Sequence, residues 1–208
     1  MKLRPTVVAL GLGIVLSASS LLANAEGDPK RGAKLAYTCL GCHGISNYKN
    51  AFPTYRVPKV GGQHEEYLNA ALKAYASGER SHPTMYAQAA TLSDQDRADI
   101  AAYLSAQPAT PAKQVVGTPP PAAAVCVACH GPDGVSPMPE YPVIAGQHAD
   151  YLEQAIRDYK SGKRKNPVMA GIAAGIKDED IPALAAFFSQ QRGVCGMDVV
   201  HKQGRCPN

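Results

Sequence analysis

Two stretches of the chain carry apolar side chains at helical spacing. In residues 67–75 the apolar positions recur at i, i+4 and i+8, and Gly78 follows as a stop. Residues 151–159 show the same spacing ahead of Gly162. No segment alternates apolar and polar positions in the way that a half-buried strand does. The pattern therefore predicts amphipathic helices that each bury one face.

Further helix starts follow from residues that favour N-terminal caps. Asp28 precedes Pro29, which favours a helix running toward the first cysteines. Ser93 precedes a segment with two aspartates in its first turn, where the helix dipole favours negative charge. A matching last helix is expected from near Asp178, and it would pack Leu184, Phe187 and Phe188. Together these signals predict an all-α fold.

The chain contains an internal duplication. A shift of 84 positions matches Gly62-Gln63-His64 with Gly146-Gln147-His148, Tyr67-Leu68 with Tyr151-Leu152, Arg80 with Arg164, Pro83 with Pro167, and Met85 with Met169. Upstream, Cys39-x-x-Cys42-His43 recurs as Cys126-x-x-Cys129-His130 after 87 positions, so the second copy is three residues shorter there. A proline-rich stretch lies between the copies. We expect a first domain over 26–110, a linker over 111–121, a second domain over 122–192 and a tail over 193–208.

The first 25 residues have the features of a secretory signal peptide. Lys2 and Arg4 precede an apolar stretch, and Ala23-Asn24-Ala25 is a small-x-small cleavage site. We expect cleavage after Ala25 and export of the mature chain to the periplasm. An uncleaved membrane anchor is the alternative, because the apolar stretch is near the lower length limit for spanning a bilayer.

The charge balance argues against one class of partner. The chain has 21 basic and 17 acidic side chains, and loss of Lys2 and Arg4 would leave a net charge of +2. Nothing resembles the basic stripe of a nucleic-acid-binding protein. We therefore expect no nucleic-acid partner, and recognition of protein partners through local charge patches.

The two Cys-x-x-Cys-His motifs are the attachment signature of c-type haem. The two thiols, Cys39 with Cys42 and Cys126 with Cys129, would form thioethers to the haem, and His43 and His130 would reach the irons. Zinc binding, a thioredoxin-like redox pair and plain disulfides are the alternatives. A zinc site would need its four ligands together, and a thioredoxin-like pair would need a βαβ pattern that is absent. Plain disulfides leave the matched histidines unexplained. The expected cofactors are two covalently attached haem c groups.

The duplication also indicates the sixth iron ligands. Met85 and Met169 are the methionines at equivalent positions, so we expect each to coordinate one iron. His82 competes in the first copy, but its equivalent is an asparagine. His64 and His148 are equivalent to each other, and their places at helix starts favour a surface or capping role over bis-histidine ligation.

Other matched residues are candidates for supporting the haems. The carbonyl groups of Pro58 and Pro142 could accept the ring N–H of the proximal histidines, and Arg80 and Arg164 could pair with haem propionates. A turn proline and a solvated arginine are the alternatives. Outside the haem motifs, Cys195 and Cys206 are expected to form a disulfide in the tail of an exported protein.

With two haem motifs, two downstream methionines and two Gly-Gln-His-x-x-Tyr-Leu segments, residues 28–191 resemble the cytochrome c4 family. The resemblance implies two tandem class I cytochrome c domains related by a pseudo-twofold axis. It also implies a periplasmic protein, often associated with the inner membrane, that delivers electrons toward terminal oxidases. Two departures are that the second copy lacks an obvious long N-terminal helix, and that the cysteine-bearing tail is outside the expected pattern.

The favoured function is a one-electron carrier, not an enzyme, between a quinol-oxidising complex and a terminal oxidase. The alternative is the di-haem cytochrome subunit of a dehydrogenase, for example a flavocytochrome c sulfide dehydrogenase. A haem peroxidase or a gas sensor is less favoured, because either needs an open iron position and both Met85 and Met169 would fill one.

Overall fold

The structure is a computed structural model that describes residues 26–110 and 114–197. Helices and one 3-10 turn make up its regular elements, and over these two ranges there are isolated bridges but no strands. The predicted all-α fold is confirmed. The expected signal peptide, part of the linker and Cys206 lie outside the described residues.

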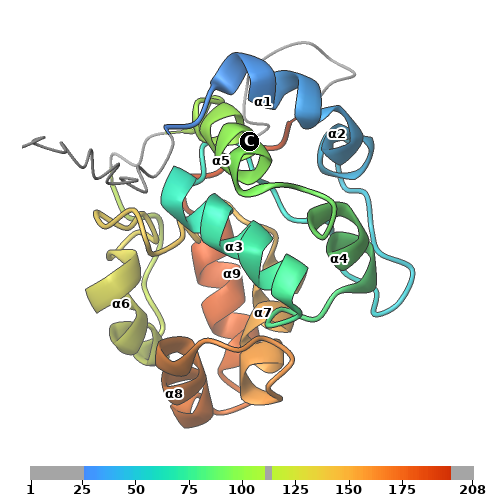
Figure 1. Ribbon diagram of the computed structural model, residues 1–208. Coiled ribbons are helices and arrows are strands. Elements are labelled where there is room, and N and C mark those ends of the chain that lie inside the picture. Colours follow the sequence, from blue (N-terminus) through green and yellow to red (C-terminus); the bar gives the residue numbers. More distant parts are fainter. Residues whose placement is uncertain (1–25, 111–113, 198–208) are drawn as a thin grey trace, which may run out of the picture.

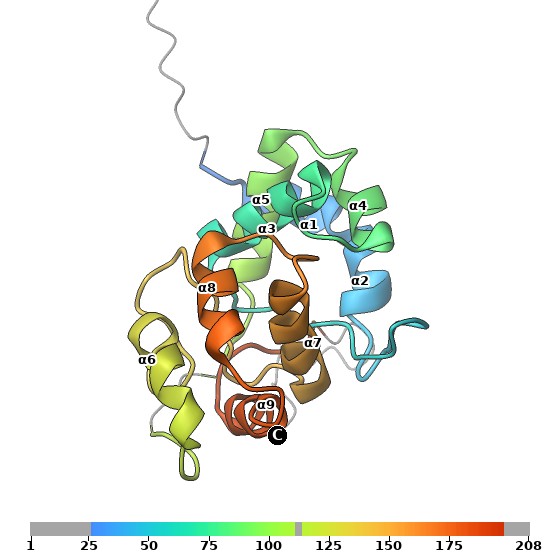
Figure 2. The same cartoon turned by 90° about the horizontal axis from the view of Figure 1, so that it is seen from below.

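The helices fall into two sets that follow the duplication (Figure 1). Helices of the first repeat are α1 (Pro29–Leu35), α2 (Tyr37–His43), α3 (Glu65–Ser77), α4 (Pro83–Ala89) and α5 (Asp94–Ser105). The second repeat has a 3-10 turn (Pro121–Ala123), α6 (Ala124–His130), α7 (Ala149–Lys160), α8 (Pro167–Gly175) and α9 (Ile181–Gln190). Figures 1 and 2 show α1–α5 gathered on one side of the molecule and α6–α9 on the other.

Most helix starts agree with the capping signals. The Asp28 side chain accepts from two backbone N–H groups of α1, and Ser93 forms a capping box with Asp96 at the start of α5. Helix α3 ends at Ser77 and is followed by Gly78, whose φ of 77° lies in the left-handed region that favours glycine. Helix α9 begins at Ile181, three residues after the expected start, with proline in its first turn and no side chain capping it.

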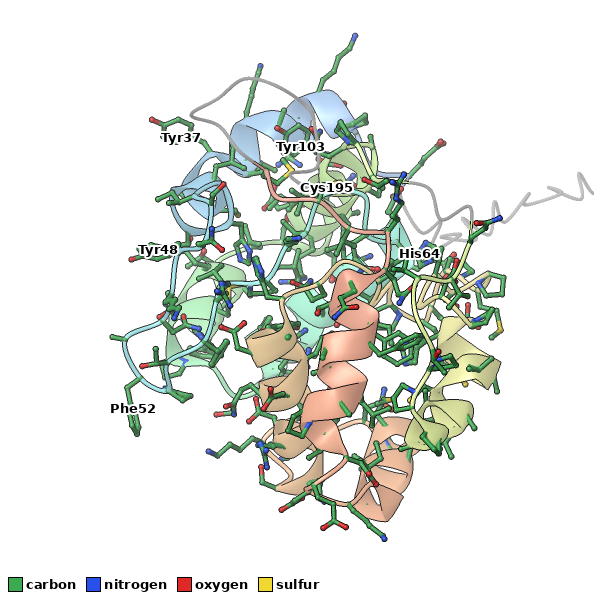
Figure 3. All side chains as sticks on the ribbon, turned by 180° about the vertical axis from the view of Figure 1, so that it is seen from behind. Tyr37, Tyr48, Phe52, His64, Tyr103 and Cys195 are labelled. Carbon is green, nitrogen blue, oxygen red and sulfur yellow. The ribbon has the colours of Figure 1, made fainter. Side chains whose placement is uncertain are left out.

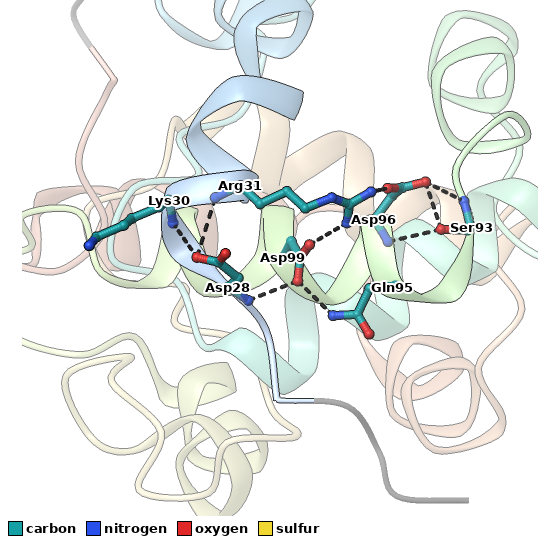
Figure 4. A network of polar contacts seen from close by, with 7 residues as sticks. All are labelled: Asp28, Lys30, Arg31, Ser93, Gln95, Asp96 and Asp99. Carbon is teal, nitrogen blue, oxygen red and sulfur yellow. Dashed lines mark hydrogen bonds and ion pairs between the residues drawn. The ribbon is translucent and has the colours of Figure 1, made fainter.

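A polar network joins the two ends of the first repeat (Figure 4). Buried Asp99 on α5 accepts from the Asp28 backbone N–H at 2.8 Å and from Gln95 at 2.7 Å, and Arg31 on α1 pairs with it. Gly32 allows the close approach, since a Cβ there would lie 1.9 Å from the Asp99 carbonyl oxygen. The network therefore anchors α1 against α5.

Replacing Asp99 with alanine should lower the free energy of unfolding by about 1–3 kcal/mol, because the partly buried hydrogen bond from the Asp28 N–H is lost and the half-exposed Arg31 loses its partner. Chemical denaturation followed by far-UV circular dichroism measures this change. Asp94→Ala on the same helix is the matched control, since that side chain is 80% exposed and should cost under about 0.5 kcal/mol. Equal costs for the two variants would contradict the anchoring role.

The second repeat is built differently at its beginning. Among its described residues there is no counterpart of α1, as the sequence predicts, and the chain passes from a 3-10 turn directly into α6. Gln191, just after α9, holds the incoming segment instead, with its side chain bonded to both the N–H and the carbonyl of Val116 at 2.8 and 2.9 Å. The two repeats therefore have the same arrangement of core helices but differ in the segment that packs near the last helix: α1 in the first repeat and the segment at Val116 in the second.

The segment after α9 returns to the first repeat, which the sequence does not reveal. Cys195 forms a backbone bridge with Gly61, with N···O distances of 3.1 and 3.0 Å (Figure 3). Met197 is buried among Ala36, Leu68, Ile100 and Leu104 of the first core. Cys195 is disulfide-bonded. Its expected partner lies outside the described residues, so the pairing with Cys206 stays a prediction.

Candidate haem sites

The two haem motifs line a cavity of about 680 Å³ between and within the repeats. Lining residues from the first repeat include Cys39, Cys42, His43 and Met85, and those from the second include Cys126, Cys129, His130 and Met169. The structure thus brings together, in each repeat, the cysteines, the histidine and the methionine that the duplication paired. A large apolar cavity that receives matched ligand sets from two repeats is the space that two macrocycles require.

His43 and His130 are held by the two proline carbonyl groups that the sequence indicated. His43 ends α2 and donates from Nδ1 to the Pro58 oxygen at 2.8 Å, and His130 ends α6 and donates to the Pro142 oxygen at 2.9 Å. Burial lowers the pKa of both imidazoles. Each ring is therefore neutral, with Nε2 free to bind a metal.

The cysteines do not have the character of a reactive redox pair. Burial raises the pKa of Cys126 to about 11 and raises that of Cys39 as well, whereas thioredoxin-like cysteines have depressed values. Within the described part of the chain, no three His, Cys, Asp or Glu side chains gather as a metal-binding group. These observations argue against the thiol redox and zinc alternatives.

Both methionines lie on short helices that sequence reasoning missed. Met85 is on α4 and Met169 on α8, and each helix has proline at its first position. The Met85 N–H donates to His82 Nδ1 at 3.3 Å, and the Met169 N–H donates to Asn166 Oδ1 at 3.0 Å. A capping residue followed by proline was the overlooked signal. His82 and Asn166 both cap the helix that follows them. This shared role explains why the two repeats can have different residues at this position.

His82→Asn should leave the α4 cap and the Met85 environment intact, because asparagine already serves at this place in α8. His82→Ala removes the acceptor and should cost about 1 kcal/mol of unfolding free energy. Denaturation curves and the far-red methionine-to-iron band of the oxidised protein measure the two effects. If the asparagine variant gained intensity in that band, His82 would be the iron ligand in the parent and the capping role would be wrong.

The surface or capping interpretation of His64 and His148 is wrong. Both residues occupy the N-cap position of a helix, but neither side chain caps it. The His64 ring instead donates from Nε2 to the Ser136 carbonyl oxygen of the other repeat at 3.0 Å (Figure 3). His148 is half-buried at the boundary, and burial, together with Lys59, lowers its pKa to about 4.

The lowered pKa of His148 predicts a loss of stability in mild acid. The unfolded chain takes up a proton near pH 6.5 while the folded chain resists it until about pH 4, so stability falls as the pH drops through that interval. After allowance for solvent screening of this half-buried group, we expect a decrease of about 1–2 kcal/mol. Denaturant unfolding at pH 7.5 and 4.5 measures the difference in the free energy of unfolding. His148→Gln should remove the contribution of His148 to that difference. An unchanged pH dependence in that variant would refute the assignment.

Arg80 and Arg164 meet at the boundary between the repeats. Their backbones form an antiparallel bridge, flanked by bonds of 2.8 Å from Ser81 N to Lys163 O and from Lys165 N to Glu79 O. These two bonds exchange places when the repeats are interchanged. The boundary therefore has the pseudo-twofold symmetry that the duplication implies.

The two guanidinium groups are buried and share tyrosine partners. Arg80 donates to the Tyr151 hydroxyl at 2.6 Å, and Arg164 donates to the same hydroxyl at 3.1 Å and to that of Tyr67 at 3.5 Å. Burial raises the pKa of Tyr151, but the two guanidinium groups outweigh it and lower the pKa to about 8. Sequence reasoning missed both tyrosines, although they occupy matched positions.

The arginine pair fits anionic groups of a bound cofactor. No carboxylate of the described residues pairs with Arg80 or Arg164, and the buried Nε of Arg164 has no hydrogen-bond partner. Two adjacent buried cations are costly unless anions compensate them. Haem propionates would supply such anions at the edge of the cavity, since both arginines line it.

Comparison with known proteins agrees with this geometry. The cytochrome c family model matches residues 29–107 and 122–192. Cytochrome c4 of Pseudomonas aeruginosa is 32% identical over 189 residues, which span 80% of this chain and 90% of that protein. The chain belongs to the cytochrome c4 family. The structure of reduced cytochrome c4 from Pseudomonas stutzeri superimposes with a TM-score of 0.62 at 31% identity, over 79% of this chain and 99% of that one.

Another relative is a thiosulfate dehydrogenase electron acceptor of Stutzerimonas stutzeri, 33% identical over 173 residues that span 74% of this chain and 79% of that protein. As a cytochrome c4 the chain is a di-haem electron carrier and not an enzyme, with two covalently bound haem c groups. Over the described ranges, no helix has the length and apolar character needed to cross a membrane.

Proposed function

We propose that this cytochrome c4 carries single electrons in the periplasm, with His43 and Met85 coordinating one iron and His130 and Met169 the other. The haem supplies an iron that alternates between ferric and ferrous states. The observation that carries the proposal is the arrangement of these four residues, at positions matched by the duplication, around one cavity. A thioether ligand opposite an imidazole favours the ferrous state and so raises the reduction potential.

The remaining residues of the site serve to position ligands and to balance charge. The Pro58 and Pro142 carbonyl groups fix the orientation of the two imidazoles. Arg80 and Arg164 compensate propionate charge at the boundary between the repeats. The methionines are held on capped helices, so that neither has to be recruited from a loop when the iron changes its oxidation state.

The proposed place of action is the periplasm, with peripheral association to the inner membrane. The support is the signal peptide expected over 1–25 and the relation to cytochrome c4. Expression with and without residues 1–25, followed by fractionation and a haem stain, tests export. Haem attachment in the absence of the leader would contradict it.

We propose a quinol-oxidising complex as the electron donor and a terminal oxidase as the acceptor. Mixing the reduced protein with membranes of the source organism and following reoxidation by stopped flow tests the assignment of the acceptor. A cyanide-sensitive reoxidation at a rate that rises with protein concentration is expected. Reoxidation no faster than the spontaneous reaction with oxygen would contradict it.

The second candidate is a dehydrogenase partner, which the relation to a thiosulfate dehydrogenase electron acceptor favours. Reduction of this protein by a thiosulfate dehydrogenase and thiosulfate would support a dehydrogenase as donor. Purification of the protein in fixed ratio with a flavoprotein would instead support a subunit of the flavocytochrome c kind. Absence of both results would leave the quinol-oxidising complex as the donor.

A further inference from the structure

Two buried glutamine side chains reach across the boundary between the repeats and form hydrogen bonds with the backbone of two equivalent residues. The Gln147 side chain donates from Nε2 to the Lys59 oxygen and accepts at Oε1 from the Lys59 N–H, both at 2.9 Å. Gln63 makes the same two bonds to Val143, both at 2.8 Å. Lys59 and Val143 are 84 positions apart, so each glutamine holds the matching residue of the opposite repeat.

Lys59 and Val143 lie directly after the prolines whose carbonyl groups hold the proximal histidines. The Pro58 carbonyl and the Lys59 N–H belong to one peptide group, which accepts from His43 on one side and donates to Gln147 on the other. In the second repeat the peptide between Pro142 and Val143 accepts from His130 and donates to Gln63. Each proximal histidine is therefore linked to the other domain through a single peptide group.

Hydrogen bonds in such a chain strengthen one another. An acceptor on the N–H side of an amide draws electron density toward the carbonyl oxygen, which then accepts more strongly from the imidazole N–H. A stronger acceptor makes the imidazole a more basic ligand, and a more basic ligand favours ferric iron. A glutamine at the far end of the chain therefore lowers the reduction potential of the iron that the histidine binds.

We propose that Gln147 and Gln63 are positioning residues that each set the reduction potential of the haem in the opposite domain. The inference rests on the proposed ligation by His43 and His130. It gives the boundary between the domains a redox role, because opening the boundary would break both chains and raise both potentials. A partner that loosens or tightens the boundary on docking would change the driving force for electron transfer.

The test uses the holoprotein with Gln147→Met and Gln63→Met, because methionine has nearly the length of glutamine. Each substitution removes the two hydrogen bonds to the opposite repeat and the one that the side chain accepts from the N–H of the next residue. The midpoint potential of each haem is measured by optical titration, with the haems distinguished by assigned NMR signals. Gln147→Met should favour reduction of the first haem by about threefold to tenfold, where tenfold is 59 mV for one electron. The second haem should change by less than half as much, and Gln63→Met should show the reverse.

We call the chain from glutamine through the peptide group to the histidine the relay. A larger shift in the midpoint potential of the haem in the opposite domain distinguishes the relay from a purely structural role of the glutamine. Simple loosening of the boundary would shift both haems alike in both variants, and a local effect would shift the haem of the mutated domain. Either result, or no shift, would overturn the proposal. If one variant does not accumulate with two haems, the other still tests the crossed effect, because each acts on a different haem.

A second measurement on the parent protein separates failure of the relay from failure of the proposed ligation. In the reduced protein, nitrogen NMR of labelled histidine shows whether His43 and His130 are bound to iron. Unbound histidines would overturn the ligation and the relay together. Bound histidines with uncrossed or unmoved potentials would overturn the relay alone.

Discussion

Met85→Ala should open one of the two irons to carbon monoxide and leave the other closed. The methionine is the proposed sixth ligand of the first haem, and alanine at this place on α4 supplies no donor atom. The reduced variant should bind one carbon monoxide per protein, against none for the parent. The oxidised variant should lose about half of its far-red methionine-to-iron band. Met169→Ala should behave in the same way at the second haem, and the double variant should bind two.

Potentials give an independent measure of the same substitutions. Loss of the thioether should lower the potential of the affected haem by on the order of 100 mV or more, because this ligand favours ferrous iron. Met138→Leu and Met197→Leu are the matched controls, since neither methionine has an equivalent in the other repeat. A parent protein that already binds carbon monoxide, or a control variant that gains this ability, would contradict the ligand assignment.

Arg164→Gln should lower the potentials of both haems. The guanidinium is buried beside Arg80 at the boundary, and its charge favours the ferrous state of an iron in either domain. For an assumed separation of about 10 Å between the charge and an iron, and an effective dielectric constant of about 20, Coulomb's law gives about 1–2 kcal/mol. For a one-electron couple this is roughly 40–90 mV, since 59 mV is a tenfold change in the equilibrium constant. Optical redox titration measures the change.

Arg157→Gln is the control for this charge effect. Its side chain is 44% exposed and pairs only loosely with Glu153, at 3.9 Å, so water and salt screen its charge. Potentials should stay within about 10 mV of the parent. If the two variants gave equal shifts, the buried pair would have no special part in compensating the cofactor.

Self-comparison of the sequence located the candidate site because both copies keep the residues that we propose to contact a haem. His43, Met85 and Pro58 each have an equivalent, and one shift of the numbering finds it without any structural knowledge. The caps of α4 and α8 were also readable, but His82 drew attention as a rival ligand. The His82 ring nitrogen caps α4, as the Asn166 side chain caps α8. A capping position accepts either residue type, whereas an iron ligand would be expected to be the same residue in both copies.

The boundary between the repeats could not be read in this way. Gln63 and His64 belong to a segment that matches within the duplication, yet their side chains bond to residues about 70 to 80 positions away in the other repeat. Periodicity and capping describe contacts within a helix or between neighbours in sequence. They do not say which surface faces the other domain. For the same reason the sequence does not predict where the tail packs. Met197 follows the second domain in sequence but is buried in the core of the first.

The central claim is two irons, each held by one histidine and one methionine, that exchange single electrons. An optical redox titration of the oxidised holoprotein that follows the far-red methionine-to-iron band tests it most directly. We expect two one-electron steps, each of which removes about half of the band. Uptake of only one electron per protein, or reduction that leaves the band unchanged, would contradict the account.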